Sequence, residues 1–168
     1  MSVKMEWKEA NELALDLVKK VHEYTPDYYN QVERVGYLLL GRGGLAVGSM
    51  MARHLDMRYV IYLPVNRGDF FQWFKVWYRS TWADIVRGLS VDTLVLVDDI
   101  NDTGETFQEV LKLLYSHSSG KEYLLLSLVK RKTSKMVGTY YAKLVEDKEY
   151  IVFPWEEFDE VKKEEVPF

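Results

Sequence analysis

The feature of this sequence that most constrains its fold is a junction between an apolar run and a cluster of acids. Residues 93–97 (TLVLV) run straight into Asp98 and Asp99, Asp102 follows, and residues 103–106 read TGET. An apolar run without polar alternation is typical of a strand that is buried on both faces of a parallel sheet. Beyond it, apolar residues recur at helical spacing up to Leu114. The sequence therefore predicts a loop between the carboxyl end of a core strand and a helix, which is where open α/β sheets bind ligands.

The beginning of that helix has the chemistry of an anion site. Free backbone N–H groups from about residue 103 to residue 106 lie at the positive end of the helix dipole and suit a phosphate. The carboxylates before them repel one another, which costs stability unless a cation or a donor-rich ligand relieves it. A sugar phosphate suits both groups, because its phosphate matches the backbone N–H groups and its hydroxyls match the carboxylates. A structural alternative stays open, because Asp102 and Glu105 have the spacing of a helix capping box and acids at a strand end can be solvated.

Residues 95–106 (VLVDDINDTGET) resemble the phosphoribosyl-pyrophosphate (PRPP) signature of the type I phosphoribosyltransferases. The resemblance implies an α/β fold with a doubly wound, mainly parallel sheet, helices on both faces and a small base-binding hood. It assigns Asp98 and Asp99 to the ribose hydroxyls and to an associated Mg²⁺, directly or through water. It assigns Asp102 to the proton on the purine N7. The residues that would hold the 5′-phosphate are Asp102, Thr103, Gly104, Glu105 and Thr106.

A glycine-rich junction comes earlier in the chain. Residues 36–40 read as a core strand and residues 45–55 as an apolar helix, with GRGG between them. The sequence GRGGLA also fits a loosened dinucleotide fingerprint, but the next strand, at about 58–63, ends without the acid that would hold a ribose. The phosphoribosyltransferase resemblance instead implies a pyrophosphate-binding loop with a cis peptide bond after its first glycine. That loop would consist of Gly41, Arg42, Gly43 and Gly44.

The segment 64–92 is the least regular part of the sequence. Aromatic residues cluster between positions 70 and 82, and one or two strands are predicted over 70–79. The resemblance implies a mobile loop here that closes over the active site, with Lys75 and Arg79 as basic residues that bind pyrophosphate. An aromatic cluster is equally typical of a contact between subunits. The two interpretations are compatible, and both stay open at this point.

Two later stretches resemble the base-binding parts of the 6-oxopurine enzymes. LVKR at 128–131 ends a buried strand, and the resemblance assigns Lys130 to the oxygen at position 6 of the base. EYIVFPWE at 149–156 is similar to the hood of short microbial xanthine–guanine and hypoxanthine enzymes. Tyr150 would stack on the purine, Ile151 would offer backbone groups to its edge, and Glu156 would contact guanine or the metal. The structural alternatives are a solvated basic loop and aromatic packing against the core.

Length and composition limit the classes of protein to which this chain could belong. A chain of 168 residues with 48% hydrophobic and 29% charged residues fits one domain, with a core at about 35–130 and a hood built from about 1–34 and 135–160. The absence of cysteine fits a reducing cytoplasm. No apolar run approaches the roughly 18 residues of a membrane span, and a net charge of −4 disfavours nucleic-acid binding. We expect a cytoplasmic homodimer or homotetramer with neither membrane nor nucleic-acid partners.

The resemblance implies a purine salvage enzyme. PRPP and a 6-oxopurine (guanine, hypoxanthine or xanthine) would give a nucleoside 5′-monophosphate and pyrophosphate, with Mg²⁺ as cofactor. One alternative is a non-catalytic regulator of the same fold that binds PRPP, although such proteins usually add a DNA-reading domain or a basic RNA face. The other alternative is a phosphoribosyltransferase for another base. Lys130 argues against adenine, because an ammonium donor matches an oxo group and not an amine.

Overall fold

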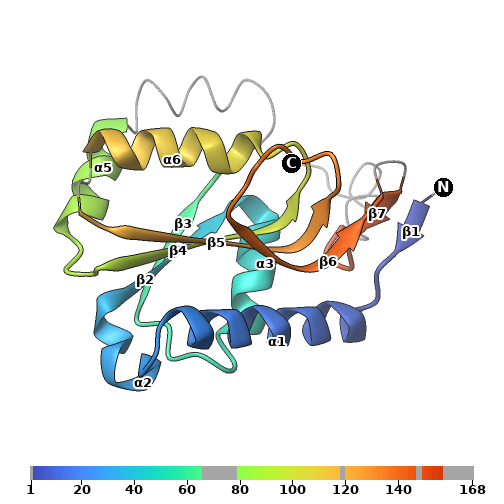
Figure 1. Cartoon of the computed structure of the whole chain (residues 1–168), viewed down its shortest axis with the longest axis horizontal. Helices are drawn as coiled ribbons and strands as arrows, with labels where there is room; N and C mark the ends of the chain where they lie inside the picture. The colour runs from blue at the N-terminus through green and yellow to red at the C-terminus, as the bar shows by residue number, and fades with distance from the viewer. Residues whose placement is uncertain (1, 66–78, 118–119, 147–148, 157–168) are drawn as a thin grey trace, which may run out of the picture.

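The centre of the molecule is a sheet of five parallel strands in the order β3-β2-β4-β5-β6 (Figure 1). The computed structural model describes residues 2–65, 79–117, 120–146 and 149–156, with only the backbone of residues 79–83 and 117. The strands are β2 (Val35–Leu40), β3 (Tyr59–Leu63), β4 (Thr93–Asn101), β5 (Glu122–Arg131) and β6 (Thr139–Val145).

Helices cover both faces of this sheet. On one face lie α1 (Trp7–Tyr24) and α3 (Gly41–Met51), and on the other lie α5 (Arg79–Gly88) and α6 (Glu105–His117) (Figure 1). A short helix α2 (Tyr28–Gln31) and a 3-10 turn η1 (Val32–Arg34) connect α1 to β2. The predicted α/β class, with a doubly wound parallel sheet, is therefore confirmed.

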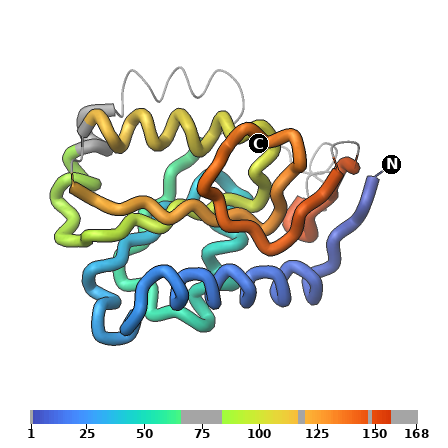
Figure 2. The backbone as a smooth tube through the Cα atoms, viewed as in Figure 1, coloured from blue at the N-terminus to red at the C-terminus, as the bar shows by residue number. Residues whose placement is uncertain are grey.

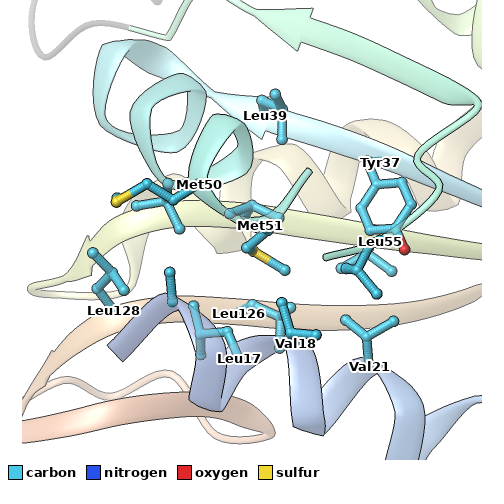
Figure 3. Packing of buried hydrophobic residues seen from close by; sticks show 14 of the residues in the cluster. Leu17, Val18, Val21, Tyr37, Leu39, Met50, Met51, Leu55, Leu126 and Leu128 are labelled. Carbon is cyan, nitrogen blue, oxygen red and sulfur yellow. The ribbon is translucent and has the colours of Figure 1, made fainter. Parts of the chain in front are cut away.

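Side chains that alternate between the two faces of the sheet divide the core into two clusters. Tyr37 and Leu39 of β2 pack on the side of α1 and α3, whereas Leu38 and Leu40 pack on the side of α5 and α6. All six residues of β2 are buried, as the unbroken apolar run predicts for a central parallel strand. Figure 3 shows the first cluster, in which side chains of α1, α3 and β5 meet across the sheet face.

A second, two-stranded sheet joins the two ends of the described chain. β1 (Ser2–Lys4) pairs in parallel with β7 (Tyr150–Val152), with Val3 opposite Ile151. The backbone N–H of Met5 extends this pairing by donating to the carbonyl of Val152 at 2.9 Å. Figure 2 shows the blue amino-terminal and red carboxyl-terminal segments side by side, next to the end of the sheet at which β4 leads into α6. We call the described residues 146–156, with β1, the hood.

Two strands are longer than the sequence predicted. β4 continues to Asn101 and β5 continues to Arg131, because the ladder between them persists through the pairs Asp98–Ser127 and Asn101–Lys130. The acids at 98 and 99 therefore lie in a strand, and the prediction that they lie in a loop was wrong. Lys130 is also a strand residue, so the alternative of a solvated basic loop does not hold for it. Polarity marked these positions as loops, but ladder hydrogen bonds depend only on the backbone.

Helix boundaries differ as well. α3 begins at Gly41, immediately after β2, so GRGG forms the first turn of the helix instead of a separate loop. The predicted cis bond is absent, since no described peptide bond is cis. Arg79 is the first residue of α5, so it does not belong to the strands predicted over 70–79, and the rest of that prediction lies outside the described residues. Within the described part of the chain, none of the helices combines the length and the apolar character that a bilayer crossing needs.

Candidate active site at the carboxyl edge of the sheet

A cavity of about 1150 Å³ opens at the carboxyl ends of β2 and β4. These two neighbours form the point at which the strand order reverses, because β3 lies beyond β2 on one side and β5 lies beyond β4 on the other. Open α/β sheets bind ligands at such a switch point. Most of the lining comes from residues 40–43, from residues 98–107 and from five positions between 150 and 156. The end of β2, the β4–α6 junction and the hood thus share one cavity.

Two adjacent carboxylates lie at the end of β4. A carboxylate oxygen of Asp98 accepts a hydrogen bond from the backbone N–H of Asp99 at 2.9 Å. The Asp99 carboxylate accepts a hydrogen bond from the indole N–H of Trp155 in the hood, at 3.3 Å. Burial raises the pKa of Asp99, and the charge of Glu156 adds to this, whereas hydrogen bonds with Trp155 and Asp98 act in the opposite direction. Asp99 is therefore a desolvated acid that the hood holds in place.

The Asp99 carboxylate lies directly over the first turn of α3. A Cβ atom built on Gly43 would come within 2.0 Å of an Asp99 carboxylate oxygen, far closer than any real contact. Any side chain at position 43 would therefore displace Asp99 or the helix start. This contact explains why the junction between β2 and α3 needs a glycine at position 43, and it links the start of α3 to the end of β4 through one acid.

The turn between β4 and α6 has only three residues, from 102 to 104. Gly104 has φ +90°, and a Cβ atom there would come within 2.5 Å of the Cβ of Met136. The backbone N–H of Glu105, which a capping box would direct to Asp102, donates to the hydroxyl of Thr103 at 3.3 Å. Asp102 instead forms an ion pair with Arg131 at 2.7 Å. Its carboxylate therefore lies at the cavity wall, paired with Arg131.

Aromatic side chains support the hood above these acids. Phe153 and Trp155 stack with ring centroids 4.9 Å apart, and Trp7 of α1 meets Trp155 edge-on at 6.0 Å. The Glu156 carboxylate accepts a hydrogen bond from the backbone N–H of Phe153 at 2.9 Å. Tyr150 lines the cavity and remains 64% exposed, so one face of its ring is available to a planar ligand.

Solved structures of known proteins share this fold. The chain superposes on a purine phosphoribosyltransferase from Pyrococcus horikoshii with a TM-score of 0.64 and 24% identity, over 94% of this chain and 95% of that one. For a xanthine–guanine–hypoxanthine phosphoribosyltransferase from Helicobacter pylori the values are 0.64 and 20%, over 96% of both chains. For a hypothetical protein from Neisseria gonorrhoeae with bound ppGpp they are 0.65 and 19%, over 95% and 93%. No protein-family model matches the chain.

This chain has the type I phosphoribosyltransferase fold. The coverage is nearly complete in both directions. At identities below 25% it establishes the fold and leaves the reaction to be argued from the site.

The phosphoribosyltransferase fold brings most of the predicted site residues to one cavity. Its lining includes the acids, the turn, the start of α3 and three hood residues that the sequence singled out. Gly44 is not in the lining, because it packs against the sheet, where a Cβ would meet the Val97 carbonyl at 2.3 Å. Lys75 and the side chain of Arg79 lie outside the described residues. The lining residues among the predicted set are Gly41, Arg42, Gly43, Asp98, Asp99, Asp102, Thr103, Gly104, Glu105, Thr106, Tyr150, Ile151 and Glu156.

The structure places Lys130 and Arg131 differently from the prediction. Lys130, the predicted base-binding residue, is not among the lining residues. Its ammonium donates to the Met136 carbonyl at 2.8 Å and lies 5.6 Å from the centre of the Tyr141 ring. Arg131, which had no predicted role, lines the cavity and holds Asp102. No local signal marked Arg131, because neighbouring residues of a strand leave the backbone on opposite faces and the register of β5 decides which of the two side chains lines the cavity.

The acids of the cavity suit a hard cation that arrives with its ligand. Among the described residues there is no group of three or more His, Asp or Glu side chains placed to hold a metal ion. Asp99 and Glu156 are nevertheless close enough for the charge of one to raise the pKa of the other. Mg²⁺ needs only one or two carboxylates when phosphate oxygens supply its other ligands. The donor set thus fits Mg²⁺ held mainly by a phosphorylated ligand, with Asp98, Asp99 and Glu156 as the nearby carboxylates.

Proposed function

We propose that this protein is a purine salvage enzyme. It transfers the 5-phosphoribosyl group from PRPP to N9 of a 6-oxopurine (guanine, hypoxanthine or xanthine), and the products are the nucleoside 5′-monophosphate and pyrophosphate. The observation that carries the proposal is one cavity shared by two helix starts, an acidic strand end and an aromatic hood. PRPP has two anionic ends separated by a ribose, and this cavity offers an amide-rich helix start for each.

Each part of PRPP has a place in this arrangement. The backbone N–H groups of residues 103–106 bind the 5′-phosphate, and those of residues 41–43 bind the pyrophosphate together with Arg42. Asp98 and Asp99 bind the ribose hydroxyls and favour the positive charge that develops on the ring as the bond to pyrophosphate breaks. When Mg²⁺ is bound with PRPP, it offsets the negative charge that develops on the leaving pyrophosphate.

The base lies between the hood and the turn. Tyr150 stacks on the purine, and Ile151 offers backbone groups to its edge. Asp102 accepts the N7 proton as N9 bonds to the anomeric carbon. Lys130 donates to the oxygen at position 6 after its ammonium leaves the Met136 carbonyl and its flexible side chain turns toward the base.

The direct test is steady-state kinetics with PRPP, Mg²⁺ and each of five bases (guanine, hypoxanthine, xanthine, adenine and uracil). We expect pyrophosphate release and formation of the nucleotide with at least one 6-oxopurine, and none with adenine or uracil. Turnover of adenine or uracil in preference to all three 6-oxopurines would place the enzyme in the alternative group that acts on another base.

A second candidate function is regulation without chemistry. One structural neighbour, a hypothetical protein, carries bound ppGpp, which is a guanine nucleotide with two pyrophosphate groups. A regulator of this kind would bind PRPP or ppGpp in calorimetry and release no pyrophosphate with any base. Competition between ppGpp and PRPP, measured in an enzyme that does turn over, would instead indicate that one site serves both ligands.

The cytoplasmic location and the dimeric or tetrameric assembly stay predictions. Sedimentation equilibrium of the purified chain measures the assembly directly. The interface role predicted for the aromatic segment at 70–82 is tested in the same experiment with substitutions in that segment.

A further inference from the structure

We infer that Arg131 is a positioning residue that holds Asp102 and ties it to the hood. The inference rests on the proposed function, in which Asp102 accepts the proton of the base. Arg131 belongs to none of the groups that bind PRPP or the base in that function. It is the last residue of β5, and the strand brings it to the wall of the cavity.

Arg131 is held at two separate places. Its Nε atom lies 2.7 Å from a carboxylate oxygen of Asp102, in the turn that follows β4. Its Nη1 atom donates to the backbone carbonyl of Glu149 at 2.7 Å and to that of Glu146 at 3.3 Å, both in the hood. One guanidinium therefore connects the catalytic turn to the segment that leads into β7.

The geometry suits an arginine and no other cation. A guanidinium has several N–H donors in one rigid plane, so it can hold a carboxylate on one side and carbonyls on another. A lysine ammonium is a point donor on a flexible chain and cannot fix both partners in the same orientation. The Arg131 side chain is only 12% exposed and that of Asp102 is 29% exposed, so water screens this pair less than it screens a surface pair.

Positioning matters here because proton transfer depends on the distance between the acceptor and the purine N7. Asp102 lies in a three-residue turn, and the backbone of a turn does not by itself fix how a carboxylate is oriented about its side-chain bonds. The two hood carbonyls hold the guanidinium, and the guanidinium in turn fixes one carboxylate oxygen. The orientation of the proton acceptor is therefore tied to the hood through the Arg131 guanidinium.

The test is a double-mutant cycle in the full-length protein, with PRPP, Mg²⁺ and the best 6-oxopurine. The variants are Arg131→Met, Arg131→Lys, Asp102→Ala and Asp102→Ala combined with Arg131→Met. Lys132→Met is the matched control, because Lys132 is the next residue, pairs with Glu146 of the same hood segment and lies outside the cavity lining. For each variant kcat, the KM of PRPP, the KM of the base and the melting temperature are measured.

We expect Arg131→Met to lower kcat about 30-fold, since small misplacements of a catalytic group cost one to two orders of magnitude. The KM of PRPP should stay within about 3-fold, and Arg131→Lys should recover only part of the loss. In the Asp102→Ala background the same change should cost less than about 2-fold, because a residue that acts through Asp102 has nothing left to position. Lys132→Met should leave kcat unchanged.

Three results would overturn the inference. A kcat loss in the double mutant equal to the product of the two single-mutant losses would show that Arg131 acts independently of Asp102. A loss confined to the KM of the base would show that Arg131 contacts the base itself. A fall in melting temperature that accounts for the lost activity, with unchanged kcat per folded molecule, would show a structural role. Absence of turnover in the unmodified protein would instead overturn the proposed function together with this inference, and the wild-type assay separates that case from the others.

Discussion

The two strand-to-helix junctions of the cavity look alike in the sequence and differ in the structure. Both consist of a buried strand, glycine and an amphipathic helix. At the first junction β2 passes into α3 without an intervening residue, and no acid lies in the first turn. At the second junction, three residues separate β4 from α6, and acids occupy positions 98, 99 and 102.

This difference shows how one fold makes two unlike anion sites next to each other. The residues of the first junction contribute amides and Arg42 and no acid of their own, which suits an anion without hydroxyls such as pyrophosphate. The second offers amides on one side and carboxylates on the other, which suits a phosphate attached to a sugar. Asp99 belongs to the second junction by sequence and lies over Gly43 of the first, so the two sites cannot vary independently.

The largest expected effect concerns Asp102, one of the acids that only the second junction has. Asp102→Ala should lower kcat by at least about 100-fold, because loss of a general base usually costs two to four orders of magnitude. PRPP affinity, measured by calorimetry, should change by less than about 3-fold. If PRPP affinity falls as far as kcat does, Asp102 serves the phosphate site and not the base.

The turn of the second junction depends on Gly104. Gly104→Ala should lower the free energy of unfolding by about 3 kcal/mol, through a positive φ and a clash with Met136. Gly120→Ala is the matched control, because Gly120 has φ +89° with nothing within 4 Å of the added Cβ, and it should lose only about 1 kcal/mol. Urea denaturation followed by tryptophan fluorescence measures the free energy of unfolding of both variants. Equal losses of this free energy would show that the Met136 contact is unimportant.

The link between the junctions depends on Gly43. Gly43→Ala should lower kcat/KM for PRPP about 30-fold, because the new methyl group displaces Asp99 and shifts the groups that hold the ribose. Gly88→Ala serves as the control, since a Cβ at Gly88 meets nothing within 4 Å, and it should leave the kinetics unchanged. A Gly43→Ala enzyme with normal kinetics would mean that Asp99 moves away without consequence.

The base site lies next to the second junction only. Lys130→Ala should raise the KM of the 6-oxopurine about 10-fold, as expected for the loss of one charge-assisted hydrogen bond. The KM of PRPP should stay unchanged, and the exposed Lys135 provides a Lys135→Ala control. Equal effects on both substrates would show that Lys130 supports the Met136 loop and does not bind the base.

The smallest expected effect is a gain of stability. The pKa of Asp99 is raised in the folded state above its value of about 3.9 in an unfolded chain. Between these two pKa values the folded state binds more protons, so the ionised Asp99 makes stability fall as pH rises through this window and stay lower above it. Asp99→Asn removes this cost and should raise the melting temperature at pH 7 by about 2 °C, while it lowers activity. The gain should vanish at a pH below about 3.9, and a gain that persists there would have another cause.

The sequence by itself determined the elements and their chemistry. The apolar run at 93–97, the acids after it and the helical spacing beyond Gly104 predicted a buried strand, a ligand site and a helix, and the structure has the strand and the helix there. Such local patterns suffice because a strand that is buried on both faces can hardly be built from any other residues. The same reasoning placed the ends of β4 and β5 too early, since polar side chains do not interrupt backbone pairing with a neighbouring strand.

Only the tertiary structure decided which residues meet. Trp155 lies 56 positions from Asp99 in the chain and donates to its carboxylate. Arg131 and Asp102 form their ion pair because β4 and β5 are neighbours and end at the same edge of the sheet. Neither contact has a local signature, since a single tryptophan or arginine fits many places equally well in sequence. Strand order and register set these distances, and both arise from packing of the whole chain.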